Sequence, residues 1–399
     1  MSPAAVHDGE RSLVYLVAGE PSGDVLGARL VAALKRRAGD RLAFAGLGGE
    51  RMAGEGIASL FPIAELSHIG LDAIPHIPHL LRRMREVGDD ALARGAQVVV
   101  TIDVPDFSAG VWRRLRGRGI PLVHYVAPTV WAWRAGRARR IARRIDHLLA
   151  LFPFEPPYFE REGLPCTFVG HPAVEGGAPR GDGAAFRARH GIARGPVVAL
   201  MPGSRHGEVG RHLGPFGDAV RTLAGRHGGL TLVLPTVQPV AAAVRAAAAG
   251  WGVPHHVVEA EAERYDAVAA ADAALVASGT ATLEVALAGV PMIVTYRTHP
   301  LTHWVGRRLV RVPYLSLVNI LLGRAAVPEL LQDECRGDAL ALALAGLLEN
   351  PGAREAQRAA MREAAALVRP DSELPSDRAA AVVLDMLARY SAAGGRKAS

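Results

Sequence analysis

Residues 13–24 read Leu-Val-Tyr-Leu-Val-Ala-Gly-Glu-Pro-Ser-Gly-Asp, an apolar run that passes directly into a loop bounded by glycines. From Val25 to Arg37, apolar side chains recur at the spacing of a helix. A continuous apolar strand followed by a helix is typical of a parallel sheet that is covered on both faces. This stretch therefore predicts an α/β fold, and the rest of the chain repeats its pattern.

The alternation of apolar strands and helices runs through two blocks, which a polar, glycine-rich stretch at 175–183 separates. Domain boundaries commonly fall in such segments, and 399 residues is about twice the usual size of one domain. We therefore expect two doubly wound, Rossmann-like domains facing across a cleft, at 1–172 and 173–365. A C-terminal helix at about 366–399 is expected to pack back on the first domain. The expected strands are 13–18, 42–46, 97–102, 122–126 and 148–152 in the first block, and 197–201, 230–234, 273–277 and 291–295 in the second.

The composition limits the classes of partner. A formal net charge of +7 would suit an anionic partner, but Lys35 and Lys397 are the only lysines and the chain is rich in Ala and Gly, which indicates a general composition bias. The isolated Cys166 and Cys335 argue against a disulfide framework or a thiolate metal site and suit the cytoplasm. No segment has the roughly 20 unbroken apolar residues of a spanning helix, so membrane contact is expected to be peripheral.

Ligands of open α/β sheets bind at the carboxyl ends of the strands, so chemistry is expected in the loops that follow them. One such loop runs from Met201 to Glu208. Gly203 permits a tight turn, Ser204 follows it, and Arg205 can hold a phosphate through two hydrogen bonds near the N–H groups of the next helix. The alternative is an ordinary turn between a strand and a helix.

A second loop of this kind, Ala277 to Glu284, contains Ser278, Gly279 and Thr280. Either hydroxyl can cap the next helix and donate to a phosphate. Glu284 lies one turn further, where a carboxylate suits paired ribose hydroxyls. The alternative is that Thr280 is only a helix cap and that Glu284 only complements the helix dipole. Two phosphate-type loops in one domain favour the functional interpretation.

In the first block, Asp103 and Asp106 follow a buried strand. Transfer of a group to a hydroxyl needs a base, and either carboxylate could serve. We interpret Asp103 as functional and Asp106 as a cap of the next helix. The loop before the first helix could add Glu20 and Ser22 to the same cleft, whereas Asp24 is interpreted as a helix cap.

Three further features are weaker signals. His76 with His79, and His299 with His303, have the spacing of metal ligands, but no third ligand is evident and nearby prolines break the helices that would align them. We therefore expect no metal. The run 134–144 holds six arginines, without a recognised nucleic-acid-binding fold around it. A solvated helix face or a contact with anionic lipid explains this run equally well, and no nucleic-acid partner is expected.

Seven motifs in one order resemble those of the lipid-A-disaccharide synthases. They extend from Leu13 to about Cys335, and the layout carries the resemblance to the C-terminal helix. Pro21 and Val318 depart from the family pattern, in which we expect Ala and Pro. The motifs are GEPSGD (19–24), IDVPDF (102–107), VAPTVWAW (126–133), PGSR (202–205), ASGTATLE (277–284), SLVNILLGR (316–324) and ELLQDEC (329–335).

The resemblance implies a glycosyltransferase fold of the B type. It implies that 2,3-diacylglucosamine passes with inversion from its UDP ester to 2,3-diacylglucosamine 1-phosphate, giving the β-1,6-linked lipid A disaccharide 1-phosphate and UDP. No cofactor is implied, because Arg205 and two helix N-termini can stabilise the leaving diphosphate. The residues implied are Asp103 as the base, Arg205, Glu284 and Asn319 at UDP, and Glu20 and Gln332 at the cleft.

Both implied substrates carry acyl chains, and each methylene withdrawn from a bilayer costs about 0.8 kcal/mol. The enzyme is therefore expected to bind the inner membrane peripherally. The segment 66–84 is apolar and ends near Arg82, Arg83 and Arg85, and it is expected to be a loop leading into a helix. It either contacts lipid or packs into the core of the first domain. The expected acyl contacts are Ile69, Leu71, Ile74, Ile77, Leu80 and Leu81.

Two other functions fit some of these features. A UDP-N-acetylglucosamine 2-epimerase would have a similar fold and similar phosphate loops, but it would need no surface for acyl chains. A non-catalytic basic module that binds lipid or nucleic acid is favoured by the arginine content and disfavoured by the loops. Whether identical chains associate is left open by the sequence.

Overall fold

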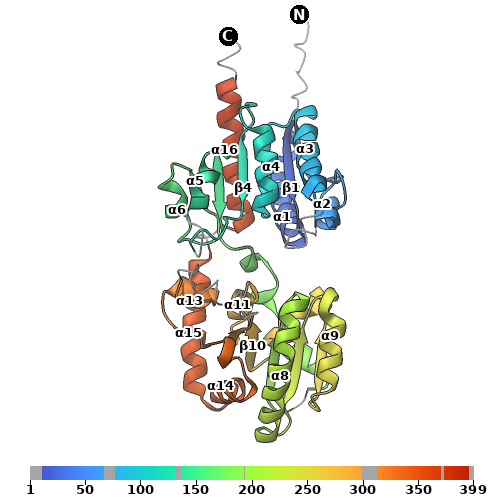
Figure 1. The fold of residues 1–399 in the computed structure, drawn as a ribbon, viewed down its shortest axis with the longest axis vertical. Coiled ribbons are helices and arrows are strands. Elements are labelled where there is room, and N and C mark those ends of the chain that lie inside the picture. Colours follow the sequence, from blue (N-terminus) through green and yellow to red (C-terminus); the bar gives the residue numbers. More distant parts are fainter. Residues whose placement is uncertain are drawn as a thin grey trace, which may run out of the picture. The chain divides into compact units, whose positions relative to one another are not determined.

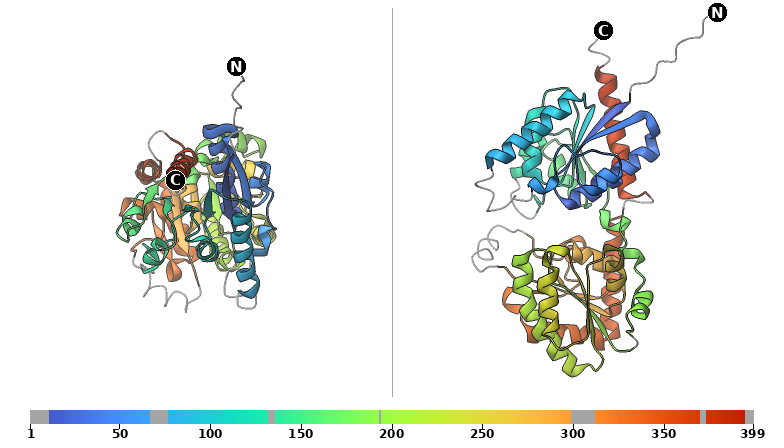
Figure 2. Two further views of the ribbon diagram at one scale, coloured as in Figure 1. Left: turned by 90° about the horizontal axis from the view of Figure 1, so that it is seen from above. Right: turned by 90° about the vertical axis from the view of Figure 1, so that its right-hand side faces the viewer.

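The structure is a computed structural model that describes residues 11–66, 77–131, 136–192, 194–298, 312–369 and 373–394. The chain divides into two compact units (Figure 1). Unit 1 consists of Met1–Pro172 with Pro370–Ser399, and unit 2 consists of Ala173–Arg369. Each unit contains a six-stranded parallel sheet with its helices (Figure 2), which confirms the predicted fold class.

The sheet of unit 1 has the strand order β2-β1-β3-β4-β5-β6. The strand order reverses between β1 and β3, and ligands of doubly wound sheets bind at this point. These two strands pair in parallel as far as Ala18 and Ile102, so that the loops beginning at Gly19 and Asp103 lie side by side. The strands are β1 (Ser12–Ala18), β2 (Leu42–Leu47), β3 (Val98–Ile102), β4 (Leu122–Tyr125), β5 (His147–Ala150) and β6 (Cys166–Phe168). The helices are α1 (Pro21–Ala38), α2 (Glu50–Gly54), α3 (Ile77–Ala93), α4 (Pro105–Leu115), α5 (Gly136–Ala142), α6 (Pro156–Glu160) and α16 (Pro375–Gly394).

The sheet of unit 2 has the order β12-β11-β10-β7-β8-β9. Its order reverses between β7 and β10, which pair in parallel as far as Met201 and Val276. The two predicted phosphate loops follow these two strands. The strands are β7 (Val197–Met201), β8 (Thr231–Pro235), β9 (His255–Val258), β10 (Ala273–Ala277), β11 (Met292–Tyr296) and β12 (Glu329–Leu331). The helices are α7 (Gly183–Arg189), α8 (His206–Arg226), α9 (Gln238–Ala249), α10 (Glu261–Ala269), α11 (Ala281–Leu287), α13 (Leu317–Leu322), α14 (Gly337–Glu349) and α15 (Pro351–Leu367).

The C-terminal helix α16 packs against α1 in unit 1, as predicted. Arg36 Nη2 lies 2.9 Å from Asp377 Oδ1, and Arg37 Nη2 lies 3.1 Å from Glu373 Oε1. The helix begins at Pro375 rather than at about 366, because the chain is still in α15 at that point. None of the helices within the described ranges is long and apolar enough to cross a bilayer.

Candidate functional site

Unit 2 contains a pocket of about 380 Å³ at the carboxyl ends of its central strands. Its walls come from the loops after β7, β8 and β10 and from the first turns of α8, α10 and α11. Seven of the predicted donor-site residues line it together: Gly203, Ser204, Arg205, Ser278, Gly279, Thr280 and Glu284. Lining residues that the sequence did not indicate include Glu208, Thr236, Val237 and Arg264.

The loop after β7 has the features of an anion site. Gly203 adopts φ +118°, and a Cβ there would lie 2.8 Å from a carboxylate oxygen of Glu208, so a side chain would be strained and crowded. The next residues begin α8, a helix of 21 residues whose first N–H groups have no helical partner. The Arg205 side chain is 82% exposed and lies 3.2 Å from Glu208 Oε1. A surface ion pair of this kind is weak, so Arg205 can turn to a bound anion at little cost.

The loop after β10 differs from the prediction in its hydrogen bonds. Thr280 occupies the N-cap position of α11, but its side chain makes no capping hydrogen bond. The Ser278 hydroxyl donates instead to the carbonyl of Leu315, at 2.9 Å. The capping interpretation of both hydroxyls is therefore wrong. Gly279 adopts φ +152°, a backbone conformation that favours glycine, and it lines the pocket.

Glu284 projects from α11 and is 21% exposed. Its Oε1 accepts hydrogen bonds from Arg264 Nη2 at 3.2 Å and from the Tyr265 hydroxyl at 3.4 Å. Arg264 and Tyr265 belong to α10, which lies outside both glycine loops. A search for glycine-rich loops therefore passes over them. The sequence marks them only as part of a helix that follows a strand.

Asn319 is not in the pocket, contrary to its predicted place at UDP. It is fully buried, and its amide Nδ2 donates to Val327 O at 2.9 Å and to Glu329 Oε1 at 2.8 Å. Its Oδ1 accepts from Ala326 N at 2.8 Å and from Val327 N at 2.9 Å. All the hydrogen-bonding positions of the side chain are thus used within the protein.

Asn319 is connected to the pocket loop after β10 through a chain of hydrogen bonds. Glu329, which Asn319 contacts, accepts backbone hydrogen bonds from Leu315 and Ser316, each at 2.9 Å. Leu315 in turn accepts the bond from Ser278. Gln332, predicted at the cleft, adopts φ +50° and accepts a hydrogen bond from Thr298 N at 3.2 Å. It does not line the pocket either.

In unit 1, Asp103 lies directly after β3 in a strained turn. It has φ +54°, and the β-branched Val104 that follows it has φ +43°. Val126, directly after the neighbouring β4, has φ +82°. Left-handed conformations in residues with a Cβ are costly and concentrate at functional sites. Asp103 Oδ1 accepts a hydrogen bond from Val104 N at 2.8 Å, whereas Oδ2 has no partner among the described residues.

The polar residues predicted in the loop before α1 and in its first turn have different roles in the structure. Glu20 and Ser22 are exposed at the start of α1, next to Gly19, whose added Cβ would lie 3.2 Å from Val104. Asp24 is indeed a helix cap, but it caps α2 instead of its own helix. Its carboxylate accepts hydrogen bonds from the backbone N–H groups of Gly49 at 2.7 Å, Arg51 at 2.9 Å and Met52 at 3.0 Å.

Asp106 is not a helix cap. The N-cap residue of α4 is Val104, and Asp106 lies in the first helical turn. Its Oδ1 pairs with Arg137 Nη2 at 2.6 Å. Arg137 belongs to α5, which carries part of the arginine run, while Arg139, Arg140, Arg143 and Arg144 are exposed.

The predicted acyl contacts are only partly described. Ile77 begins α3 and is 47% exposed, Leu81 is half-buried, and Leu80 is buried in the core of unit 1. Leu80 therefore cannot be a surface contact, because its side chain belongs to the hydrophobic core of unit 1. Arg83 pairs with Glu65 at 2.6 Å. Ile69, Leu71, Ile74, His76, His299, His303 and Arg134 lie outside the described residues.

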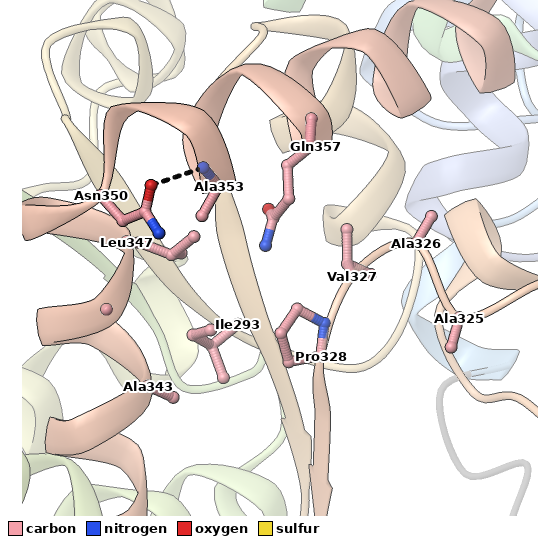
Figure 3. Close-up of a pocket in the computed structure, with 12 residues that line it drawn as sticks. Ile293, Ala325, Ala326, Val327, Pro328, Ala343, Leu347, Asn350, Ala353 and Gln357 are labelled. Atoms are coloured by element: carbon pink, nitrogen blue, oxygen red, sulfur yellow. Dashed lines mark hydrogen bonds between the residues drawn. The ribbon is translucent and has the colours of Figure 1, made fainter.

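Figure 3 shows a different pocket of unit 2, of about 470 Å³, formed by β11, α14, α15 and the segment before β12. It lies at the amino end of β11, away from the two glycine loops. Asn350 Oδ1 caps α15 by accepting from Ala353 N at 3.1 Å, and Gln357 Oε1 accepts from Met292 N at 2.8 Å. None of the described residues that line this pocket is charged, so we do not assign the reaction to it.

The comparisons with known proteins agree with this geometry. The family model of lipid-A-disaccharide synthetase matches residues 14–383. The chain is 51% identical over 381 residues to the lipid-A-disaccharide synthase of Rhodospirillum centenum, covering 94% of this chain and 95% of that protein.

Two solved structures share the fold at low sequence identity. A co-structure of MnaA from S. aureus with UDP has a TM-score of 0.65 at 12% identity, covering 92% of this chain and 94% of that one. MurG from Acinetobacter baumannii has a TM-score of 0.56 at 15% identity, covering 94% of this chain and 100% of that one. The fold is therefore the B-type glycosyltransferase fold, as predicted. By its family match and its relatives, this chain belongs to the lipid-A-disaccharide synthases, which are glycosyltransferases.

Proposed function

We propose that the chain transfers 2,3-diacylglucosamine from UDP-2,3-diacylglucosamine to the 6-hydroxyl of 2,3-diacylglucosamine 1-phosphate, with inversion at the anomeric carbon. The products are the β-1,6-linked disaccharide 1-phosphate and UDP. One observation carries this proposal: a single pocket of unit 2 combines a helix N-terminus, an exposed arginine and an anchored carboxylate. These are the groups that a nucleoside diphosphate requires.

The donor's diphosphate binds beside Gly203, Ser204 and Arg205 in this proposal. Backbone N–H groups at the start of α8 point to the anion, and Arg205 adds a positive charge. The loop from Ser278 to Thr280 forms the opposite wall. As the glycosidic bond to UDP breaks, the same groups stabilise the negative charge that develops on the leaving diphosphate. The ribose lies at Glu284, whose carboxylate accepts hydrogen bonds from its hydroxyls.

Asp103 is the proposed base. Its free Oδ2 removes the proton from the acceptor hydroxyl while that oxygen attacks the anomeric carbon. The position is supported by the strained turn at Asp103 and Val104 and by the adjoining Gly19 loop, since such strain marks functional sites. Glu20 and Ser22 are proposed to contact the acceptor from the start of α1.

The acyl chains of both substrates remain in the membrane in this proposal, and the protein binds there peripherally. The exposed Ile77 and the half-buried Leu81 lie one helical turn apart on α3, with Arg82 and Arg85 exposed beside them. Apolar side chains next to arginines suit the surface of an anionic bilayer. Withdrawing a chain costs about 0.8 kcal/mol per methylene, which favours catalysis at the interface.

The deciding experiment mixes the purified protein with both lipid substrates in detergent and identifies the products by mass spectrometry. We expect UDP and a disaccharide 1-phosphate that appear only when both substrates are present, and turnover that persists in EDTA. A 2-epimerase would convert UDP-N-acetylglucosamine to its epimer without an acceptor, and a non-catalytic module would yield neither product. Either result would overturn the proposal.

A further inference from the structure

The Glu284 carboxylate is asymmetric in its surroundings. Arg264 and Tyr265 both donate to Oε1, while Oε2 has no hydrogen-bond partner among the described residues. Arg264 Nη2 also donates to the Tyr265 hydroxyl at 2.8 Å. The three side chains therefore form one closed cluster that anchors one carboxylate oxygen and leaves the other open.

We propose that Arg264 and Tyr265 are positioning residues that direct Glu284 Oε2 to the ribose hydroxyls and thereby select ribose over deoxyribose. This inference rests on the proposed donor site. An unanchored carboxylate would lose rotational freedom on binding, and holding it in place beforehand removes that cost.

Tyr265 is itself held in place by the glycine-rich segment that precedes α7. A Cβ at Gly177 would collide with Cδ2 of the Tyr265 ring, and a Cβ at Gly181 would collide with the Tyr265 backbone carbonyl. The Arg264 guanidinium lies over the ring, 4.8 Å from its centroid. Neither glycine has a positive φ, so these positions are required by close packing and not by backbone conformation.

The phenol remains a hydrogen-bond donor at neutral pH. Burial raises the pKa of Tyr265 above its ordinary value, and the neighbouring Glu284 carboxylate raises it further. Arg264 is 24% exposed and lines the pocket, so a direct contact with the diphosphate is the competing role. A positioning role predicts that loss of Arg264 weakens only ligands that carry the ribose 2′-hydroxyl. A direct contact with the diphosphate predicts that it weakens every ligand that carries a diphosphate.

The test measures the affinity of UDP, 2′-deoxy-UDP and inorganic diphosphate by calorimetry. The wild-type protein should prefer UDP to 2′-deoxy-UDP by at least about tenfold, the effect of one hydrogen bond to a charged group. Arg264→Met and Tyr265→Phe should bring this ratio towards one while the affinity for diphosphate stays the same. Arg264→Lys should retain part of the preference. In turnover, KM for the donor should rise with little change in kcat.

Gly177→Ala should reduce the same ratio by displacing the Tyr265 ring. Gly225→Ala is the matched control, because a Cβ at this α8 position meets nothing within 4 Å. Equal losses for all three ligands in the Arg264 variant would assign it to the phosphates and overturn the inference. An unchanged ratio in folded variants would also overturn it. If the wild-type protein fails to bind UDP, the proposed donor site itself is wrong.

Discussion

Replacing Asn319 distinguishes a structural residue from a nucleotide ligand. In Asn319→Ala, the N–H groups of Ala326 and Val327 lose their acceptor, and Glu329 Oε1 and Val327 O lose a donor. A buried group left without its partner costs about 1–3 kcal/mol. Val327 is almost fully buried, whereas Ala326 is half-buried and can recruit water. We therefore expect a loss of about 3–5 kcal/mol in the stability of unit 2.

Asn319→Asp should destabilise unit 2 more at high pH than at low pH. Its carboxylate would replace an amide that lies 2.8 Å from Glu329 Oε1, and two carboxylates at this distance cannot both be ionised without strong repulsion. The destabilisation of this variant should therefore grow as the pH rises, because a proton shared between the two carboxylates relieves the repulsion only at low pH. The destabilisation of Asn319→Ala should stay nearly constant over the same pH range.

Thermal unfolding and UDP calorimetry decide the question together. For a unit of this size, each kcal/mol shifts Tm by about 2–4 °C, so Asn319→Ala should lower it by roughly 10 °C. Well below that Tm, UDP affinity should change by less than about tenfold. The matched control is Asn350→Ala, which removes one exposed helix cap and should cost about 1 kcal/mol. A wild-type Tm with abolished UDP binding in Asn319→Ala would refute this reasoning and return the residue to the nucleotide site.

Four more outcomes are expected. Asp103→Asn keeps the acceptor for Val104 N, so folding and UDP binding should stay intact. Turnover should fall at least about a hundredfold, and near-normal turnover in the folded variant would exclude Asp103 as the base. Arg205→Ala should weaken UDP by about 1.5–3 kcal/mol in calorimetry without lowering Tm, whereas unchanged affinity would remove it from the donor site. The double variant Ile77→Ser, Leu81→Ser should sediment less with anionic liposomes and should have a higher KM for the lipid acceptor, while its UDP affinity stays the same. Undiminished liposome binding would place the membrane-binding surface elsewhere on the protein. Burial raises the pKa of Glu155 to about 7, above its ordinary 4.5, so its contribution to stability is present at low pH and is lost as the pH rises through 7. Urea unfolding between pH 5 and 8 should show this decline in the wild-type protein and a flatter profile in Glu155→Gln, and equal slopes would contradict it.

The central strands were predictable because each is a continuous apolar run. Strands buried on both faces by helices need apolar side chains at every position, and β3 and β10 are fully buried along their whole length. The three strands that were not predicted, β6, β9 and β12, are all edge strands and have three or four residues each. Their short and partly polar sequences carry too little periodicity to be recognised.

The sequence by itself determined the parallel α/β fold and the two glycine loops of unit 2. Both depend on neighbours in the chain, since an apolar run, a glycine and the start of a helix are local features. Asn319 and Arg264 were decided only by the tertiary structure. Each residue type is equally suited to binding a nucleotide and to holding another part of the protein. Which role it takes depends on the groups that folding brings within hydrogen-bonding distance: Glu329 and the 326–327 backbone for Asn319, and Glu284 for Arg264.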